Sequence, residues 1–493
     1  MKRLLTLLLV TLLILCWTGI ANAEATAEVL PCRYAIPGSE CNDSQMVQDA
    51  INEKLKADGY NIDFQFVYIP WDVWDQKVNI MLATGEEFEL LQIMEDWLPS
   101  STYINLGGII PLEDLLDTYA PNLRDFIEPD LWDAVSMNGH IYSVPVVYRD
   151  MSADGGQSYQ MQYLEKYGLD VPTTEEEFID VMKTILEGEN DPELHAYWRL
   201  DDYKTSQCFL RSSDRWPFEV VEMLVGIDQE GNVFSWLDSP EFQHECEFVR
   251  KLYEIGYINE DVLTIPVDTR TAKKFSGEWI ATETSIYAEV TNVINNKPEA
   301  VFEDHFLYPE KEKFYGTWIY MNANAVSATS KHPEAGIMFL DWLYSSQENY
   351  DLLHYGIEGR NWEAIGEDEY RALPGVDGET CDYVFGDWLA GNYHYVRCPE
   401  GTPDTYKPFI NSFNTEAAYS IATGFHFDPS NVSSEYSAVL AEIQSSAIPM
   451  KAGVVSWEDG HEAMLNMVNA AGYQEVVAEF QRQFAEWLAQ KQQ

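Results

Sequence analysis

The stretch PWDVWDQKVNIMLATGEEFELLQIMEDW, residues 70–97, decides the fold. Its first part predicts a helix, because apolar residues recur at three- and four-residue spacing until a glycine. The apolar run from Phe88 to Met94 then predicts a buried parallel strand, which ends directly before Glu95, Asp96 and Trp97. Open α/β sheets bind ligands beyond the carboxyl ends of their strands. The stretch therefore predicts a ligand site with two carboxylates and an indole.

The residues before this stretch predict the same kind of sheet. Residues 29–36 are typical of a strand, and a helix follows to about residue 57, with Asp43 or Ser44 as its cap. Residues 61–69 alternate apolar and polar side chains, as a second strand does. A β-α-β beginning of this kind predicts a parallel sheet covered by helices.

Length and charge restrict the classes of protein. The chain has 493 residues, more than one core usually supports, so two or more lobes are expected. Its formal net charge is −52, and the acidic residues are spread along the chain. Nucleic acids and anionic lipid surfaces would be repelled, so neither is an expected partner.

The first 23 residues predict a secretory signal peptide. Lys2 and Arg3 precede an apolar stretch, and an A-x-A cleavage site ends at Ala23. The apolar stretch is too short to cross a bilayer comfortably, which takes about 20 residues. Lipid attachment at Cys16 is the alternative, but Leu15 occupies the position where a lipobox needs a small residue. We expect cleavage after Ala23 and an exported, extracellular or periplasmic protein associated with the cell envelope.

Six cysteines remain after this cleavage, and an even number in an exported protein favours disulfides. No C-x-x-C motif is present, which argues against a redox motif or a zinc knuckle. Six cysteines allow 15 connectivities. Neighbours in the sequence suggest the pairs Cys32–Cys41, Cys208–Cys246 and Cys381–Cys398.

The chain lacks the usual signatures of catalysis and of cofactors. It has no G-x-S-x-G, no Walker loop and no dinucleotide fingerprint. His461 and Glu462 begin like a zincin motif, but Leu465 stands where the second histidine belongs. The acidic segment 228–232 is typical of a hairpin turn and lacks the later glutamate of a calcium loop. We therefore expect neither an enzyme nor a bound cofactor or metal.

Several motifs, in order along the chain, carry a family resemblance. They are W-D-A-x-x-x-N-G-x-I-Y-x-V-P at 132–145, ATSKHPE at 328–334, L-L-x-Y-G-I-E-G at 352–359 and GFHFDPSNVSSEYSAV at 424–439. An amphipathic helix is expected over 473–491. Together they resemble the bacterial extracellular solute-binding proteins of family 1, which feed ABC importers. The last two features resemble the C-terminal domain of unknown function of the lipoprotein-like subgroup.

This resemblance implies an α/β fold with two lobes, a hinge and a central ligand cleft, the type II periplasmic-binding-protein fold. It implies a lobe one of residues 28–148 and 312–342, and a lobe two of 149–311 and 343–493. The implied mechanism is hinge closure around a carbohydrate, with the closed form recognised by the permease subunits of the importer. We expect a monomer. The alternatives are a secreted carbohydrate-active hydrolase and a surface interaction protein without a small ligand.

Candidate ligand residues combine aromatic rings, which stack on sugar faces, with polar groups that bond to hydroxyls. Trp71 and Trp74, beside a helix start, are expected to pack instead. For Trp318 and Asn322, on a returning strand, core packing is an equal alternative to ligand contact. The candidates are Glu95, Asp96 and Trp97; Tyr148 and Arg149 at the first crossing between lobes; Glu283 and Tyr287, by resemblance; Trp318 and Asn322; Arg360 and Asn361; and Trp388 and Asn392.

Overall fold

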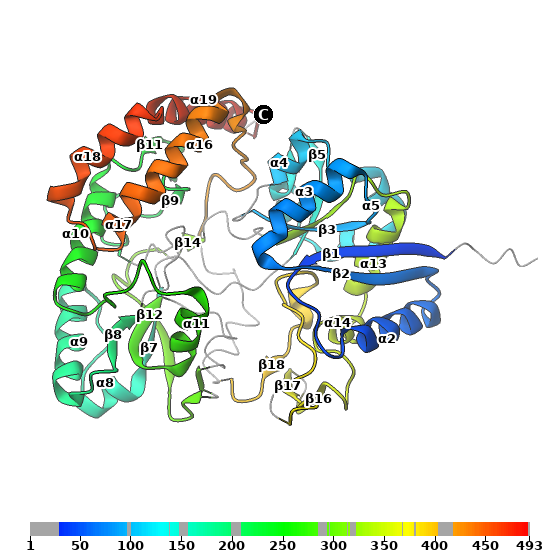
Figure 1. Cartoon of the computed structure of the whole chain (residues 1–493), viewed down its shortest axis with the longest axis horizontal. Coiled ribbons are helices and arrows are strands. Elements are labelled where there is room, and N and C mark those ends of the chain that lie inside the picture. Colours follow the sequence, from blue (N-terminus) through cyan, green and yellow to red (C-terminus); the bar gives the residue numbers. More distant parts are fainter. Residues whose placement is uncertain are drawn as a thin grey trace, which may run out of the picture.

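The computed structural model describes residues 29–95, 100–137, 139–146, 156–198, 209–283, 293–294, 296–312, 314–315, 322–366, 368–378, 381–402 and 418–491. It forms two lobes, each built of strands and helices (Figure 1). For Glu283, the structure describes the backbone but not the side chain. The expected signal peptide lies outside the described residues, as do Asp96, Trp97, Tyr148, Arg149, Tyr287, Trp318 and Cys208.

Lobe one contains a five-stranded sheet. Strand β1 runs parallel to β2 and β3, and β15 runs antiparallel to β3 and to β6. All five residues of β3 are buried, as the apolar run predicted. In order across the sheet the strands are β2 (Ile62–Ile69), β1 (Leu30–Pro37), β3 (Leu90–Met94), β15 (Asn322–Val326) and β6 (Ser143–Pro145).

Helices cover this sheet. The predicted helix before β3 is α3, and it ends at Gly85, whose φ of 72° is the left-handed conformation that glycine adopts easily. The ring of Phe64 on β2 stacks on that of Phe339 on α13, with centroids 4.2 Å apart. The helices of lobe one are α2 (Ser44–Ala57), α3 (Trp74–Thr84), α4 (Ser100–Asn105), α5 (Glu113–Tyr119), α6 (Pro121–Phe126), α7 (Pro129–Ala134), α13 (Pro333–Tyr344) and α14 (Gln347–His354).

The expected boundary of lobe one after residue 342 is wrong. Leu353 on α14 and the later residues Tyr383 and Leu389 are buried in the same core as strands β1 and β3. Most buried apolar side chains of this segment pack in lobe one, so we assign 29–146 and 322–402 to lobe one. Tyr350, Val396 and Cys398 form a smaller cluster with Trp279 and Phe302 of the other lobe. It also contains β4 (Ser136–Met137), β5 (His140–Ile141), β16 (Trp362–Ala364), β17 (Glu369–Ala372) and β18 (Cys398–Pro399).

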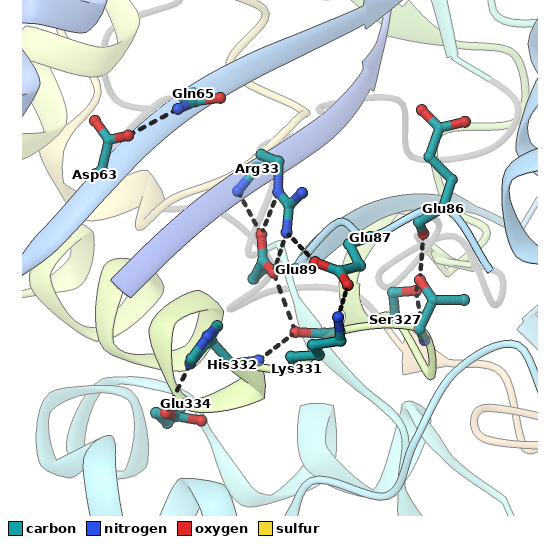
Figure 2. A network of polar contacts seen from close by, with 12 residues as sticks. Arg33, Asp63, Gln65, Glu86, Glu87, Glu89, Ser327, Lys331, His332 and Glu334 are labelled. Carbon is teal, nitrogen blue, oxygen red and sulfur yellow. Dashed lines mark hydrogen bonds and ion pairs between the residues drawn. The ribbon is translucent and has the colours of Figure 1, made fainter. Parts of the chain in front are cut away.

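A charged network closes the amino-terminal end of β3 (Figure 2). The side chain of Glu89 is inaccessible to solvent. Its carboxylate accepts three hydrogen bonds from Arg33, at 2.9 to 3.1 Å, one of them from the backbone N–H. Ser330 adds a longer bond at 3.3 Å, and Glu87 bridges Arg33 and Lys331. The ATSKHPE motif therefore contributes Ser330 and Lys331 to holding this end of the sheet.

Lobe two comprises residues 156–312 and 418–491. Its predicted helix start is confirmed: Thr174 caps α9 by accepting a bond from the Glu177 N–H at 3.3 Å, and three acidic residues occupy the first turn. Its mixed sheet has the order β13 (Phe302–Phe306), β7 (Gly156–Gln160), β12 (Trp279–Glu283) and β8 (His195–Trp198). The helices beside it are α8 (Met161–Tyr167), α9 (Glu175–Glu189) and α11 (Val267–Ser276).

The C-terminal helices of lobe two pack on a small antiparallel sheet. Tyr473, buried at the start of α19, donates to the Leu224 carbonyl at 2.6 Å. The predicted turn at 228–232 joins β10 to β11, and Asp228 accepts bonds from the backbone of Glu230 and Asn232. The elements are β9 (Phe218–Val221), β10 (Val225–Asp228), β11 (Val233–Ser235), α10 (Pro240–Glu254), α16 (Ser433–Glu442), the π-helix Ile443–Ala447, α17 (Ile448–Lys451), α18 (Trp457–Ala470) and α19 (Tyr473–Lys491).

Two short strands, β14 (Phe314–Tyr315) and β19 (Ala418–Tyr419), pair in parallel. Within the described part of the chain, no helix is long and apolar enough to cross a membrane.

The suggested pairs Cys32–Cys41 and Cys381–Cys398 are not bonded in this structure. Cys32, Cys41 and Cys381 carry free thiols. Cys32 is fully buried within β1, and that strand continues to Pro37, about 17 Å further at the usual rise, before the turn toward Cys41. Disulfides need Cα atoms within about 7 Å, so the pair Cys32–Cys41 does not suit this fold. The pair Cys208–Cys246 is not tested, because Cys208 lies outside the described residues.

Candidate functional site

One edge of the first sheet brings together three segments that the sequence analysis singled out. Strand β3 ends at Met94, which pairs with Asn322, the first residue of the antiparallel strand β15. The Val146 N–H, just past β6, donates to the Asn322 carbonyl at 2.9 Å. Glu95, Val146 and Asn322 therefore lie together at the carboxyl end of β3. Seven of the candidate ligand residues are at these positions or close to them in the sequence.

The sheet of lobe two presents a comparable edge. Glu283, the last residue of β12, pairs with Gln157 near the start of β7. Gly156, which opens β7, pairs with Phe306, the last residue of β13. The chain leaves the first sheet at Val146 and enters the second at Gly156, so these two edges are consecutive along the chain. Glu283 therefore stands at a strand end, and its role as a ligand residue stays a prediction.

Glu95 connects the first sheet to lobe two. Both of its carboxylate oxygens lie 3.2 Å from the Ser100 N–H, at the start of α4. One oxygen lies 4.0 Å from Nδ1 of His426, whose Nε2 is 3.0 Å from the Ala134 carbonyl. His426 belongs to the C-terminal part of the chain, so this contact spans the two lobes. His426 is not among the residues predicted from the sequence, although it stands in the motif GFHFDPSN.

A pocket of about 820 Å³ lies between lobe one and the C-terminal helices. At one rim, Asn105 of lobe one lies 3.4 Å from the Asp428 carboxylate. The volume is within the usual range for small-molecule sites, and indole, guanidinium, amide and carboxylate groups line it together. The lining residues are Asn105, Asp133, Ser136, Met137 and Gly139 from lobe one, and Thr423, Gly424, Phe425, His426, Asp428, Asn431, Arg482, Gln483, Glu486, Trp487, Gln490 and Lys491 from lobe two.

Arg360 and Asn361 bind neighbours within lobe one, and their role as ligand residues stays a prediction. The Arg360 guanidinium binds both oxygens of Asp43, at 2.9 and 3.1 Å, and reaches Asp382 at 3.3 Å. This contact with Arg360 lowers the pKa of Asp43. Asn361 is 1% exposed, donates to Asp43 at 2.8 Å and accepts from the Ile357 N–H at 2.9 Å. Their polar groups are therefore engaged inside the lobe.

The two residues predicted near 390 differ in environment. Asn392 is 2% exposed and accepts a bond from the His394 N–H, and its role as a ligand residue stays a prediction. Trp388 is half-buried, and its ring lies 5.8 Å from that of Trp71. Trp71 is 42% exposed rather than packed, whereas Trp74 is buried as expected. Because Trp71 follows the end of β2, this indole pair lies at the carboxyl edge of the first sheet.

Over the described ranges, no group of three or more His, Cys, Asp and Glu side chains is arranged to hold a metal ion.

Comparison with known proteins agrees with this architecture. The family model of the bacterial extracellular solute-binding proteins matches residues 43–350, and that of a domain of unknown function, DUF3502, matches 421–489. A carbohydrate ABC transporter substrate-binding protein of Streptococcus pneumoniae is 26% identical over 451 residues, which cover 90% of this chain and 87% of that protein.

Two solved structures share the fold. The N-glycan transport solute binding protein NgtS of S. pneumoniae has a TM-score of 0.78 at 22% identity, over 94% of this chain and 100% of that one. The substrate-binding protein FusA of S. pneumoniae, in complex with kestose, has a TM-score of 0.67 at 15% identity, over 93% of this chain and 100% of that one. The predicted two-lobed α/β fold is confirmed. The chain belongs to the bacterial extracellular solute-binding protein family, whose members bind solutes and do not catalyse reactions.

Proposed function

We propose that this protein is the substrate-binding component of an ABC importer and that its ligand is an oligosaccharide. The observation that carries the proposal is that the strand-end edges of the two sheets follow each other along the chain, at Val146 and Gly156. Family membership and the carbohydrate transporter relative, which aligns over nearly the whole chain, support the same function.

The arrangement of side chains suits a sugar. The exposed face of Trp71 beside Trp388 offers an apolar surface for the C–H face of a pyranose or furanose ring. Asn322, at the start of β15, and Glu95, at the end of β3, supply amide and carboxylate groups for hydroxyls at the same edge. Asp96, Trp97, Tyr148, Arg149, Tyr287 and Trp318, whose segments adjoin the two edges, stay in the proposed site as predictions from the sequence.

Transport follows from closure of the lobes around the ligand. Contacts to both edges stabilise the closed form, and the affinity is reduced by the free energy that closure costs. The permease subunits then recognise the closed form and accept the sugar. The protein acts as a monomer outside the cytoplasmic membrane and is held at the cell envelope.

A calorimetric titration of the mature chain with a panel of defined oligosaccharides tests this function. We expect saturable binding of at least one glycan, which chromatography then recovers unchanged. Formation of a shorter product would instead indicate a hydrolase. Absence of binding across the panel would indicate a surface interaction protein without a small ligand.

A further inference from the structure

Two cysteines from distant parts of the sequence lie in adjoining segments of lobe one. Cys41 follows the turn after β1, and Cys381 follows β17. Next to Cys41, the Asp43 N–H donates to the Asp382 carbonyl at 3.0 Å, and the Asn42 amide donates to the Asp382 carboxylate at 2.8 Å. The segments that carry the two thiols are therefore held together by both backbone and side-chain bonds.

The sulfur atoms of Cys41 and Cys381 each lie near a backbone carbonyl oxygen of the segment 383–384. The Cys41 Sγ lies 3.7 Å from the Val384 carbonyl oxygen. The Cys381 Sγ lies 3.2 Å from the carbonyl oxygen of Tyr383, the residue before Val384. Burial raises the pKa of Cys381, and the charges of Asp382, Asp43 and Cys41 act in the same direction. Both thiols are partly accessible, whereas Cys32 is fully buried in the core.

We propose that Cys41 and Cys381 form a disulfide in the exported protein. The oxidant is an external disulfide, either of a small thiol such as glutathione or of a thiol oxidoreductase. One thiol loses its proton and attacks the external disulfide, which releases one external thiol and leaves a mixed disulfide. The second protein thiolate then attacks that mixed disulfide and displaces the second external thiol. Two protein thiols and one external disulfide become one protein disulfide and two external thiols.

This bond would join the two separate stretches of chain that build lobe one. Residues 29–146 would be tied to residues 322–402 next to the contact of Arg360 with Asp43 and Asp382. Closing so long a loop restricts the unfolded chain strongly. Lobe one would then move as one covalently closed body when the lobes open and close, because the link lies within this lobe.

Mass spectrometry of the full mature chain tests the proposal directly. The protein is incubated with oxidised glutathione, unfolded, alkylated and digested without reduction. We expect a peptide containing Cys41 linked to one containing Cys381. Cys41→Ser and Cys381→Ser should each leave the partner thiol unlinked, whereas Cys32→Ser, the matched control, should keep the linked peptide. Alkylation of both thiols after this oxidation, or a link from Cys41 to another cysteine, would overturn the proposal.

Thermal unfolding provides a second readout. For the oxidised wild type, reductant should lower the Tm by several degrees. The shift caused by reductant should be smaller in Cys41→Ser, in Cys381→Ser and in the double variant, and equal among the three. An equal shift in the wild type and these variants would show that the stabilising bond is elsewhere.

Discussion

The two ends of strand β3 carry acidic residues with opposite roles. At the amino end, Glu89 is inaccessible to solvent and its carboxylate is fully engaged by Arg33 and Ser330 (Figure 2). At the carboxyl end, Glu95 retains some exposure, caps α4 and faces His426 of the other lobe. Both residues flank the same five-residue strand.

This difference shows that acidic residues at the two ends of one strand can serve different purposes, stability at one end and binding at the other. A carboxylate surrounded by donors of its own lobe holds that lobe and has no capacity left for a ligand. A carboxylate at the edge where the chain crosses between lobes contacts groups whose position changes when the lobes move. The same side chain chemistry thus serves the fold at one end of the strand and, as we propose, the ligand at the other.

The largest expected effect is the loss of the buried acid. Glu89→Ala should lower the free energy of unfolding by about 3–5 kcal/mol, because Arg33 loses its buried partner. Denaturant titration measures this. Glu87→Ala is the matched control: Glu87 is 35% exposed and its partner Lys331 is 72% exposed, so only a small change in the free energy of unfolding is expected. Equal effects of the two substitutions would remove the distinction between the buried and the surface acid.

The second prediction concerns His354 on α14, which lies away from both ends of β3 and should make the stability of lobe one sensitive to acid. Burial lowers the pKa of His354 to about 3 from an ordinary value of 6.5. Between these pH values the unfolded chain takes up a proton that the folded protein does not. The contribution of His354 to the free energy of unfolding is therefore fully present above about pH 6.5 and is lost as the pH decreases. The loss amounts to about 3 kcal/mol from pH 7 to pH 4.

Denaturant titrations of the wild type and His354→Phe across this pH range measure the contribution. Phenylalanine keeps a ring against Tyr350, on which His354 stacks at 3.9 Å, and cannot take up a proton. We expect a flatter stability profile for the variant. Parallel profiles for the two proteins would place the acid sensitivity in other groups.

At the carboxyl end of β3, substitution should affect binding rather than folding. Trp97→Ala should weaken oligosaccharide binding by about 1–3 kcal/mol through loss of a stacking surface, and adding Asp96→Asn should weaken it further. Calorimetry measures the affinity and circular dichroism the fold. Tyr119→Ala, which removes a 39% exposed aromatic residue from the end of α5, is the control and should bind normally. Normal binding or unfolding of Trp97→Ala would make Trp97 a packing residue.

The smallest effect concerns the indole pair at the same edge. Trp71→Ala should reduce oligosaccharide affinity by about 0.5–1.5 kcal/mol and leave the stability nearly unchanged, because the ring is partly exposed. Phe126→Ala, at a 41% exposed aromatic residue on α6, serves as the control. Unchanged affinity in Trp71→Ala would restrict the sugar site to the end of β3.

The site could be predicted from the sequence only as far as the backbone was predictable. The apolar run 88–94 predicted β3, and this placed Glu95 at the carboxyl edge, where the structure has it. Arg360 and Asn361 follow the turn at Gly359. Their hydrogen-bond partner Asp43 lies more than 300 residues earlier in the chain. A partner so distant leaves no local signal, so the engagement of these residues within lobe one could not be predicted from the sequence.

The sequence by itself determined the strands, helix ends and turns, because periodicity, caps and turn residues act over a few neighbouring residues. The Thr174 cap, the Gly85 helix end and the hairpin at 228–232 are examples. Only the tertiary structure decided which polar groups are already engaged, which lobe covers residues 343–402, and where Asn105 meets Asp428 across the pocket. These outcomes depend on packing between segments hundreds of residues apart, where burial and complementary charge act through space rather than along the chain.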